Sequence, residues 1–139
     1  MKTFEELDIR AELLYSETHE WARAGAGGNV VRVGVDDYAQ SALGDIVYVE
    51  PPSVGDSVTA GAVCGSLEST KAVSDINSPV TGHVSAVNEA LSDSPELINS
   101  SPYEDGWIFD VEIAGPVSLQ GLMTGGAYSK FLGTLNRDD

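Results

Sequence analysis

The sequence predicts a single, mostly β domain, and three observations support that prediction. Short apolar runs alternate with polar residues along most of the chain, which is the period of a half-buried strand. Turn-forming residues, including 15 glycines and 6 prolines, separate these runs. The 139 residues, of which 42% are hydrophobic, are enough to bury one core without a metal or a disulfide.

The strand pattern recurs from near the N-terminus to residue 113. The predicted strands are residues 13–15, 20–23, 30–35, 46–49, 58–64, 72–76, 83–87 and 107–113. Glycine-rich residues 25–29 predict a turn, because glycine tolerates positive φ and weakens a strand. Residues 46–49 are apolar on both faces and predict a strand buried on both sides, which Pro51 and Pro52 end.

Helical patterns are short. Residues 36–43 predict a helix with an acidic start that Gly44 closes. Residues 1–12 could form one or two helical turns, and residues 88–91 another. The polar stretch 92–101 is predicted to be a connection without regular structure.

The C-terminal part of the chain changes to a helical period. Its apolar residues at that spacing are Leu119, Leu122, Met123, Tyr128, Phe131 and Leu132. Gly125 and Gly126 lie between the two groups, so the pattern predicts two short helices that cover the β core. A packed lid is a simpler interpretation of these residues than a binding surface.

The charge balance is strongly acidic. There are 22 Asp and Glu against 7 Lys and Arg, and the formal net charge is −15. This argues against nucleic acid as a partner, because binding to phosphates depends on clustered Lys and Arg. It favours partners with basic docking surfaces, since opposed charges speed association and allow release at moderate salt.

Membrane insertion, a disulfide and a metal site are not expected. No apolar run approaches the roughly 18 residues of a membrane span, and residues 1–6 lack the basic character of a signal or transit peptide. We expect a cytoplasmic protein of bacterial type, or a mitochondrial matrix protein if the chain is a mature organellar form. Cys64 is the only cysteine and is interpreted as a packing residue in a reducing compartment. His19 and His83 lack metal-ligand spacing and are interpreted as ordinary polar residues.

Lys71 is the candidate functional residue. It lies between two strand-like runs, beside small neighbours, and between Glu68 and Asp75 in a chain poor in cations. This pattern predicts a hairpin with Lys71 at its tip. A solvated lysine on an ordinary turn is the simpler interpretation, since lysines are normally exposed. The residues around the hairpin favour a functional lysine.

Those residues resemble the lipoyl and biotinyl carrier domains, in which a hairpin lysine holds the cofactor. Within that group, the Glu-Ser-Thr-Lys-Ala run at residues 68–72 is similar to the H-protein family of the glycine cleavage system. The similarity to that family extends to residues 18–21 (Thr-His-Glu-Trp), 37–40 (Asp-Tyr-Ala-Gln), 43–45 (Leu-Gly-Asp) and 99–107, whereas residues 54–61, 78–84 and 87–88 resemble the carrier domains in general. It therefore covers nearly the whole chain, from Leu13 to Leu135.

The resemblance implies a barrel-sandwich hybrid fold of short antiparallel strands, with a short internal helix and C-terminal helices. It implies a carrier domain over residues 13–139, which an N-terminal extension at residues 1–12 precedes. Lipoate would be attached covalently to Lys71. Glu68 and Asp75 would flank the hairpin or contribute to recognition by the attaching enzyme.

The resemblance also implies a sheltering cleft. In the family the lipoyl arm is thought to fold back on the protein, which keeps the aminomethyl cargo from water. By motif, the residues nominated for this cleft are Thr18, Glu20 and Tyr38, together with Asp75. The open alternatives are that Glu20 is only a surface carboxylate and that Tyr38 is only a core ring.

The function that the resemblance implies is transport without catalysis. The carrier would take the aminomethyl group of glycine from glycine decarboxylase (the P protein) to aminomethyltransferase (the T protein). Dihydrolipoamide dehydrogenase (the L protein) would then reoxidise it, and lipoyl-attaching enzymes would modify it beforehand. Carboxylates near Lys71 favour its ammonium form, which argues against Schiff-base chemistry and for acylation by another enzyme.

Three alternatives are open. Within the carrier class, an H-like protein could act mainly in lipoyl relay to other lipoate-dependent complexes. An enzyme would use His19, Glu20 or Lys71 in catalysis, but no nucleophile, base and orienting group form a recognisable set. A plain interaction module would leave the hairpin unmodified, and the intact mass of protein from its own cells would distinguish it.

Overall fold

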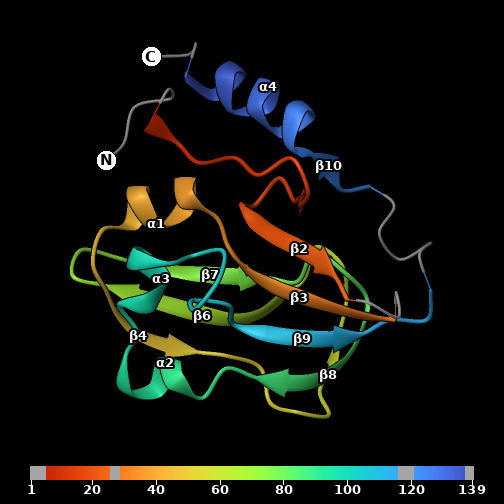
Figure 1. The fold of residues 1–139 in the computed structure, drawn as a ribbon. Helices are drawn as coiled ribbons and strands as arrows, with labels where there is room; N and C mark the ends of the chain where they lie inside the picture. The colour runs from red at the N-terminus through yellow and green to blue at the C-terminus, as the bar shows by residue number, and fades with distance from the viewer. Residues whose placement is uncertain (1–5, 26–28, 116–120, 137–139) are drawn as a thin grey trace.

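The computed structural model describes residues 6–25, 29–115 and 121–136 of the chain (Figure 1). The strands are β1 (Leu14–Tyr15), β2 (Glu20–Ala24), β3 (Val30–Val35), β4 (Ile46–Glu50), β5 (Ser57–Val58), β6 (Val63–Ser69), β7 (Val73–Asn77), β8 (Gly82–Val87), β9 (Phe109–Glu112) and β10 (Met123–Thr124). The helices are α1 (Asp37–Leu43), α2 (Ala90–Asp93), α3 (Leu97–Ser100) and α4 (Gly125–Asn136). The predicted mostly β fold with a short internal helix is confirmed.

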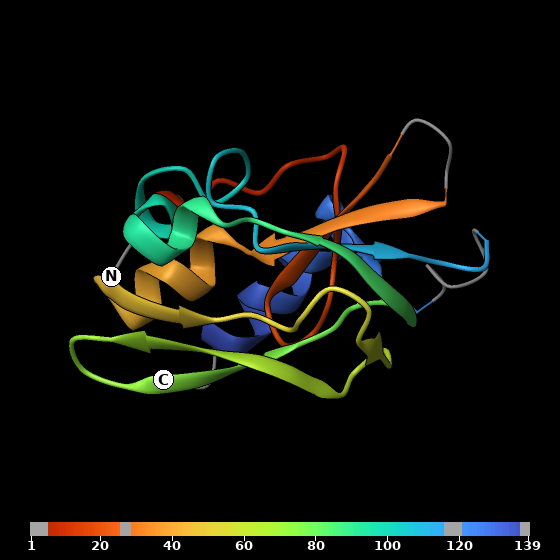
Figure 2. The ribbon, with the colours of Figure 1, turned by 90° about the horizontal axis from the view of Figure 1, so that it is seen from below.

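Two antiparallel sheets form the two layers of the fold (Figure 2). The larger has seven strands in the order β10-β1-β2-β3-β9-β8-β5, and the smaller has three in the order β4-β6-β7. Their facing sides bury one apolar core, to which Val31 and Phe109 come from the larger sheet and Leu67 and Ile76 from the smaller. This alternation of buried and exposed residues is what the period of two predicts.

A second, largely aromatic core lies between α4, the segment before β1 and the β1–β2 end of the larger sheet (Figure 1). The rings of Tyr15 and Tyr128 stack in it with centroids 4.4 Å apart. Trp21 is completely buried and covers Gly34 on β3. Only glycine fits at position 34, because a Cβ there would lie 2.7 Å from the indole ring.

Two strand predictions were wrong. Residues 46–49 are not buried on both sides, because Val47 and Tyr48 are 49% and 56% exposed. The smaller sheet has the core on one face only, so β4 faces solvent on the other. Residues 58–64 do not form one strand either: β5 ends at Val58, Gly61 turns the chain at φ +84°, and β6 begins at Val63.

The helix predictions were correct for α1 and for the turn at residues 88–91, where α2 begins at Ala90, and residues 1–5 of the predicted N-terminal turns lie outside the described residues. Leu7 and Ile9 both pack on the aromatic core, with no helix over residues 7–10. Helix α3 forms inside the stretch predicted to be irregular. At the C-terminal end, residues 123–124 pair with β1 as β10, and α4 is the one helix in the described part of that region. Leu119 lies outside the described residues.

Gly125 opens helix α4 rather than separating two helices. A Cβ at this position would lie 2.8 Å from the carbonyl oxygen of Arg10, so the start of the helix can lie directly on the N-terminal segment. Among the described residues, no helix is both long enough and apolar enough to cross a bilayer.

Candidate functional site

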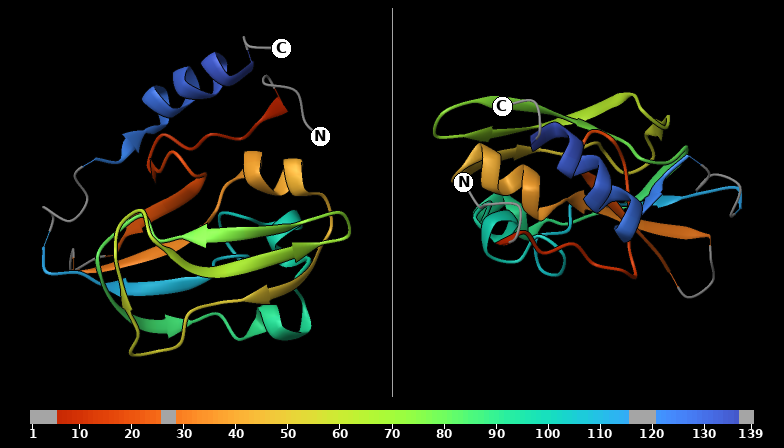
Figure 3. Two further views of the ribbon diagram at one scale, coloured as in Figure 1. Left: turned by 180° about the vertical axis from the view of Figure 1, so that it is seen from behind. Right: turned by 90° about the horizontal axis from the view of Figure 1, so that it is seen from above.

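The β6–β7 hairpin projects from the smaller sheet (Figure 3) and carries Lys71 at its tip. Glu68 pairs with Val73, and the N–H of Ser69 donates to the carbonyl of Ala72 at 2.8 Å, which leaves Thr70 and Lys71 as the loop. The prediction that Lys71 lies at the tip of a hairpin is therefore confirmed.

Ser69 fixes the shape of the tip. Its side chain is nearly buried, and its Oγ accepts hydrogen bonds from the N–H of Lys71 at 3.2 Å and of Ala72 at 3.1 Å. The same hydroxyl lies 3.2 Å from the carbonyl oxygen of Ala72, to which it can donate. A serine that bonds the following backbone groups stabilises a turn without glycine.

The loop that follows α1, at Gly44 and Asp45, contacts the hairpin tip and supports it. The N–H of Thr70 donates to the carbonyl of Asp45 at 3.1 Å. Gly44 caps α1 with φ +79°, and a Cβ at this position would lie 3.7 Å from Cε of Lys71. The aliphatic stem of Lys71 therefore lies close to the backbone of Gly44.

Asn99, on α3, holds this supporting loop. Its Nδ2 donates to the carbonyl of Gly44 at 2.9 Å and to Oε1 of Gln40 at 3.1 Å, and its Oδ1 accepts from the N–H of Ile46 at 2.9 Å. Sequence reasoning missed this role, because α3 was not predicted. The only signal was an Asn inside a segment that resembles the H-protein family.

The side chain of Lys71 is exposed, and within the described residues its amine forms no ion pair and no hydrogen bond. Glu68 and Asp75 flank the hairpin on its outer face, but neither carboxylate contacts Lys71 as an ion pair. That these two carboxylates favour the ammonium form of Lys71 stays a prediction. A free amine on a fixed turn does fit a covalently attached group, since nothing in the described chain competes for it.

Glu20 lies elsewhere, in the layer between the sheets. It is 1% exposed, so the alternative of a surface carboxylate is wrong. The hydroxyls of Ser16 and Thr18 donate to its Oε1, and the N–H of Asn77 donates to its Oε2 at 3.1 Å. Burial raises its pKa to about 7, although these hydrogen bonds oppose the shift.

The structure joins Thr18 to Glu20 by a hydrogen bond, and among the described residues Tyr38 forms no hydrogen bond with either of them. Thr18 is exposed at the rim of a groove of about 470 Å³ that Ala60, Gly61 and Pro79 also line. The half-buried ring of Tyr38 packs against His19, with centroids 4.5 Å apart. Thr18, Glu20 and Tyr38 make no hydrogen bond with Lys71 in the described structure.

His19 is part of a buried polar network that sequence reasoning missed. Its φ is +74°, and its Nδ1 lies 2.6 Å from the hydroxyl of Tyr128, which donates to the carboxylate of Asp36. Burial lowers the pKa of His19 to about 4 and raises that of Asp36 to about 7. Three separate segments meet here, so no local pattern could have revealed the contact.

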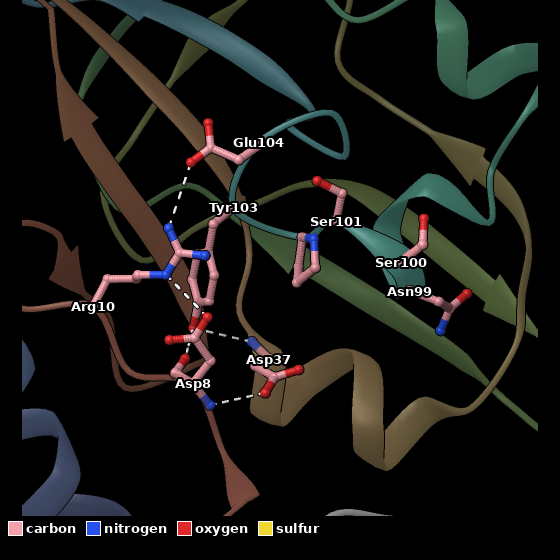
Figure 4. A pocket seen from close by; sticks show the side chains of 9 residues that line it. Asp8, Arg10, Asp37, Asn99, Ser100, Ser101, Tyr103 and Glu104 are labelled. Atoms are coloured by element: carbon pink, nitrogen blue, oxygen red, sulfur yellow. Dashed lines mark hydrogen bonds and ion pairs between the residues drawn. The ribbon is translucent and has the colours of Figure 1, made fainter.

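A polar hollow beside the start of α1 ties the N-terminal segment to the domain (Figure 4). Arg10 pairs with Asp8 at 3.0 Å and with Glu104 at 3.4 Å, and its guanidinium lies 4.8 Å from the ring centroid of Tyr103. The N–H of Asp8 donates to the carboxylate of Asp37 at 2.9 Å. These groups bind each other, so the hollow is a structural contact.

The described residues contain no group of three or more His, Cys, Asp and Glu side chains that could hold a metal ion. Cys64 packs half-buried against the main core, and burial raises the pKa of its thiol to about 11, which disfavours the nucleophilic thiolate.

A two-layer β fold with an exposed lysine at the tip of an acidic hairpin places the chain in the class of lipoyl-domain-like barrel-sandwich proteins. The sequence model of the family described as "Glycine cleavage H-protein" matches residues 13–135. The chain therefore belongs to the glycine cleavage H-protein family.

Individual proteins agree with the family match. The chain is 55% identical over 118 residues to the glycine cleavage system H protein of Micrococcus luteus. The aligned region covers 84% of this chain and 91% of that protein. The chain is 52% identical over 123 residues to that of Teredinibacter turnerae, with 88% and 94% covered. The crystal structure of a glycine cleavage system H protein from Mycobacterium marinum superposes with a TM-score of 0.82 at 38% identity, covering 90% of this chain and 99% of that chain.

Proposed function

We propose that Lys71 carries lipoate as an amide, and that the protein serves as the carrier of the aminomethyl group in glycine cleavage. The observation that carries this proposal is the contrast at the hairpin tip. The backbone around Lys71 is bound through Ser69 and Asp45, whereas its amine is exposed and has no partner among the described residues.

This arrangement suits a tether. A fixed turn sets the point from which an attached chain extends, and tethering raises the effective concentration of the reactive end at each docked enzyme. When bound, lipoate would supply the disulfide chemistry that accepts the aminomethyl group and the electrons, and the protein would supply placement. The described residues offer no catalytic set of their own, so the chemistry would occur in the partner enzymes.

The partners follow from this role. They are glycine decarboxylase, aminomethyltransferase, dihydrolipoamide dehydrogenase and the enzymes that attach the lipoyl group. Glu68 and Asp75 contribute negative charge beside the tip, which favours partner surfaces with basic residues around the active-site mouth. The bacterial origin of the relatives supports a cytoplasmic location.

The sheltering cleft centres on Thr18. Its hydroxyl lies at the rim of the groove and donates to the buried carboxylate of Glu20, so an ammonium group bound there would lie close to a group that can ionise near neutral pH. Tyr38 would bound the site on the side of His19. Asp75 would contribute its charge from the outer face of the hairpin.

Reconstitution tests the proposal. Lipoylated protein, mixed with the three glycine-cleavage enzymes, glycine, tetrahydrofolate and NAD, should give glycine-dependent NADH formation, whereas the unlipoylated protein should give none. Equal rates with both forms would contradict the proposal. Lipoylated protein that supports no glycine cleavage but does transfer its lipoyl group to other acceptors would favour the relay alternative.

A further inference from the structure

The outer face of the smaller sheet carries an exposed apolar pair beside the hairpin tip. Tyr48 on β4 pairs with Glu68 on β6, which pairs with Val73 on β7, so the three side chains form one row across the sheet. Tyr48 is 56% exposed and Val73 68% exposed. Their neighbours Val49 and Leu67 point to the opposite face and are buried in the core.

Carboxylates surround this pair. The next row across the same face is Glu50, Ser66 and Asp75. Within the described residues, no ion pair or side-chain hydrogen bond engages the carboxylates of Glu50, Glu68 and Asp75, and the hydroxyl of Tyr48 has no partner either. The face therefore combines two apolar side chains with unneutralised negative charge, and its charge complements a basic partner.

The row is continuous with the site of modification. Glu68 and Val73 are the last residue pair before the tip that contains Lys71. Ser69, which shapes the tip, pairs with Ile46 on β4, so the tip and Tyr48 belong to one hydrogen-bonded unit. A protein that reaches the amine of Lys71 from the side of this face must lie over Tyr48 and Val73.

We propose that Tyr48 and Val73 are the apolar anchors of a docking surface for the enzyme that acylates Lys71, and that the surrounding carboxylates contact a basic rim on that enzyme. This inference rests on the proposed lipoylation of Lys71. The attaching enzyme is the occupant that fits best, because it must bring an acyl carbon to the lysine nitrogen itself. An enzyme that acts on the far end of a lipoyl chain does not need to contact this row, because the chain can reach an active site some distance from Lys71.

The step that the docked enzyme performs is an acyl transfer. The deprotonated amine of Lys71 attacks the carbonyl carbon of an acyl adenylate, and the C–N bond of the amide forms. The bond from that carbon to the phosphate oxygen breaks, AMP leaves with the electron pair, and the ammonium proton goes to solvent. No electron transfer is involved.

The test compares enzymatic with non-enzymatic acylation. A lipoate–protein ligase supplied with ATP and octanoate acts on the wild-type chain, on Tyr48→Thr, on Val73→Thr and on the double variant, with modification of Lys71 followed by mass. Threonine keeps the strand preference while reducing apolar surface. The matched control is Val63→Thr, which changes a 58% exposed valine at the far end of β6.

We expect kcat/KM for the double variant to fall about tenfold or more, mainly through KM, with a part of the loss in each single variant. The control should stay within about twofold of wild type. Raising the salt concentration should increase the wild-type KM, since the rim contacts are charged. Acetylation of Lys71 by a small activated ester should proceed equally in all variants, which shows that the hairpin is intact.

The two proposals fail differently. If the ligase does not acylate wild-type Lys71, the proposed function is overturned, and this inference with it. If the ligase acylates the wild type and the double variant with equal kcat/KM, only the docking surface is overturned.

Discussion

The carboxylate of Glu20, on β2 of the larger sheet, accepts a hydrogen bond from the N–H of Asn77, at the end of β7 in the smaller sheet, with 3.1 Å between the two atoms. A buried acid thus links the two layers of the fold at the end of β7 that lies away from Lys71. Because burial raises its pKa to about 7, this link must show in the dependence of stability on pH.

Glu20→Gln should remove a loss of stability that the wild-type protein suffers as the pH rises. The folded protein holds the Glu20 proton more tightly than the unfolded chain does, so the free energy of unfolding falls as pH rises from 4.5 to about 7. The variant lacks this titration. Urea unfolding should therefore show its stability relative to wild type rising by about 3 kcal/mol between pH 4.5 and pH 7.5.

The control for this prediction is Glu17→Gln, which changes an exposed carboxylate in the turn between β1 and β2. Its stability relative to wild type should stay constant across the same pH range. If the free energy of unfolding of Glu20→Gln also differs from that of the wild type by the same amount at every pH, the folded protein does not raise the pKa of Glu20.

Tyr128→Phe should destabilise the fold more at pH 8 than at pH 5.5. The Tyr128 hydroxyl donates to Asp36, whose pKa burial raises to about 7, so the lost hydrogen bond matters most when that carboxylate is ionised. We expect a loss of about 1–3 kcal/mol at pH 8. Tyr38→Phe, measured alongside by urea unfolding, should cost under about 0.5 kcal/mol, and a pH-independent loss in Tyr128→Phe would refute the proposed coupling.

Asn99→Ala should loosen the support of the hairpin tip. The change removes the hydrogen bonds to Gly44, Gln40 and Ile46, and we expect the free energy of unfolding to fall by about 2 kcal/mol. The amide of Thr70, which is bonded to the carbonyl of Asp45, should exchange with solvent faster. Ser100→Ala, on the same helix, should change neither the free energy of unfolding nor the exchange rate of the Thr70 amide. An unchanged Thr70 exchange rate in Asn99→Ala would contradict the role of Asn99 in supporting the hairpin tip.

Lys71→Arg should leave the fold intact and abolish function. The side chain is exposed, so the free energy of unfolding should change by less than about 0.5 kcal/mol, but a guanidinium cannot take the place of the acylated amine. Glycine-dependent NADH formation in the reconstituted system measures the loss. Lys130→Arg, on the exposed side of α4, is the matched control and should retain full turnover.

Local patterns were enough to predict much of the fold. The strand over residues 30–35, the helix α1 with its acidic start and Gly44 cap, and the hairpin that presents Lys71 each depend on short-range periodicity and turn chemistry. The exposed face of β4 was missed, because a run that is apolar at every position does not reveal how many sides of a sheet are covered.

The rest of the site depends on contacts between distant segments. Asn99 donates a hydrogen bond to Gly44, and Tyr128 donates one to Asp36. Neither Asn99 nor Tyr128 belongs to a local sequence pattern that predicts its partner. Glu20 was singled out by motif, but its burial and its bond to Asn77 follow only from how the two sheets pack. The division at residue 13 between an extension and the carrier domain stays a prediction.

The most direct measurement is the tryptic mass map of protein purified from cells that make lipoate. A lipoylated Lys71 resists trypsin, so we predict loss of cleavage after residue 71 and a peptide joining residues 33–71 to residues 72–130, heavier by one lipoyl group. Cleavage after an unmodified Lys71 in all of the protein would contradict the proposal that this lysine is the attachment point.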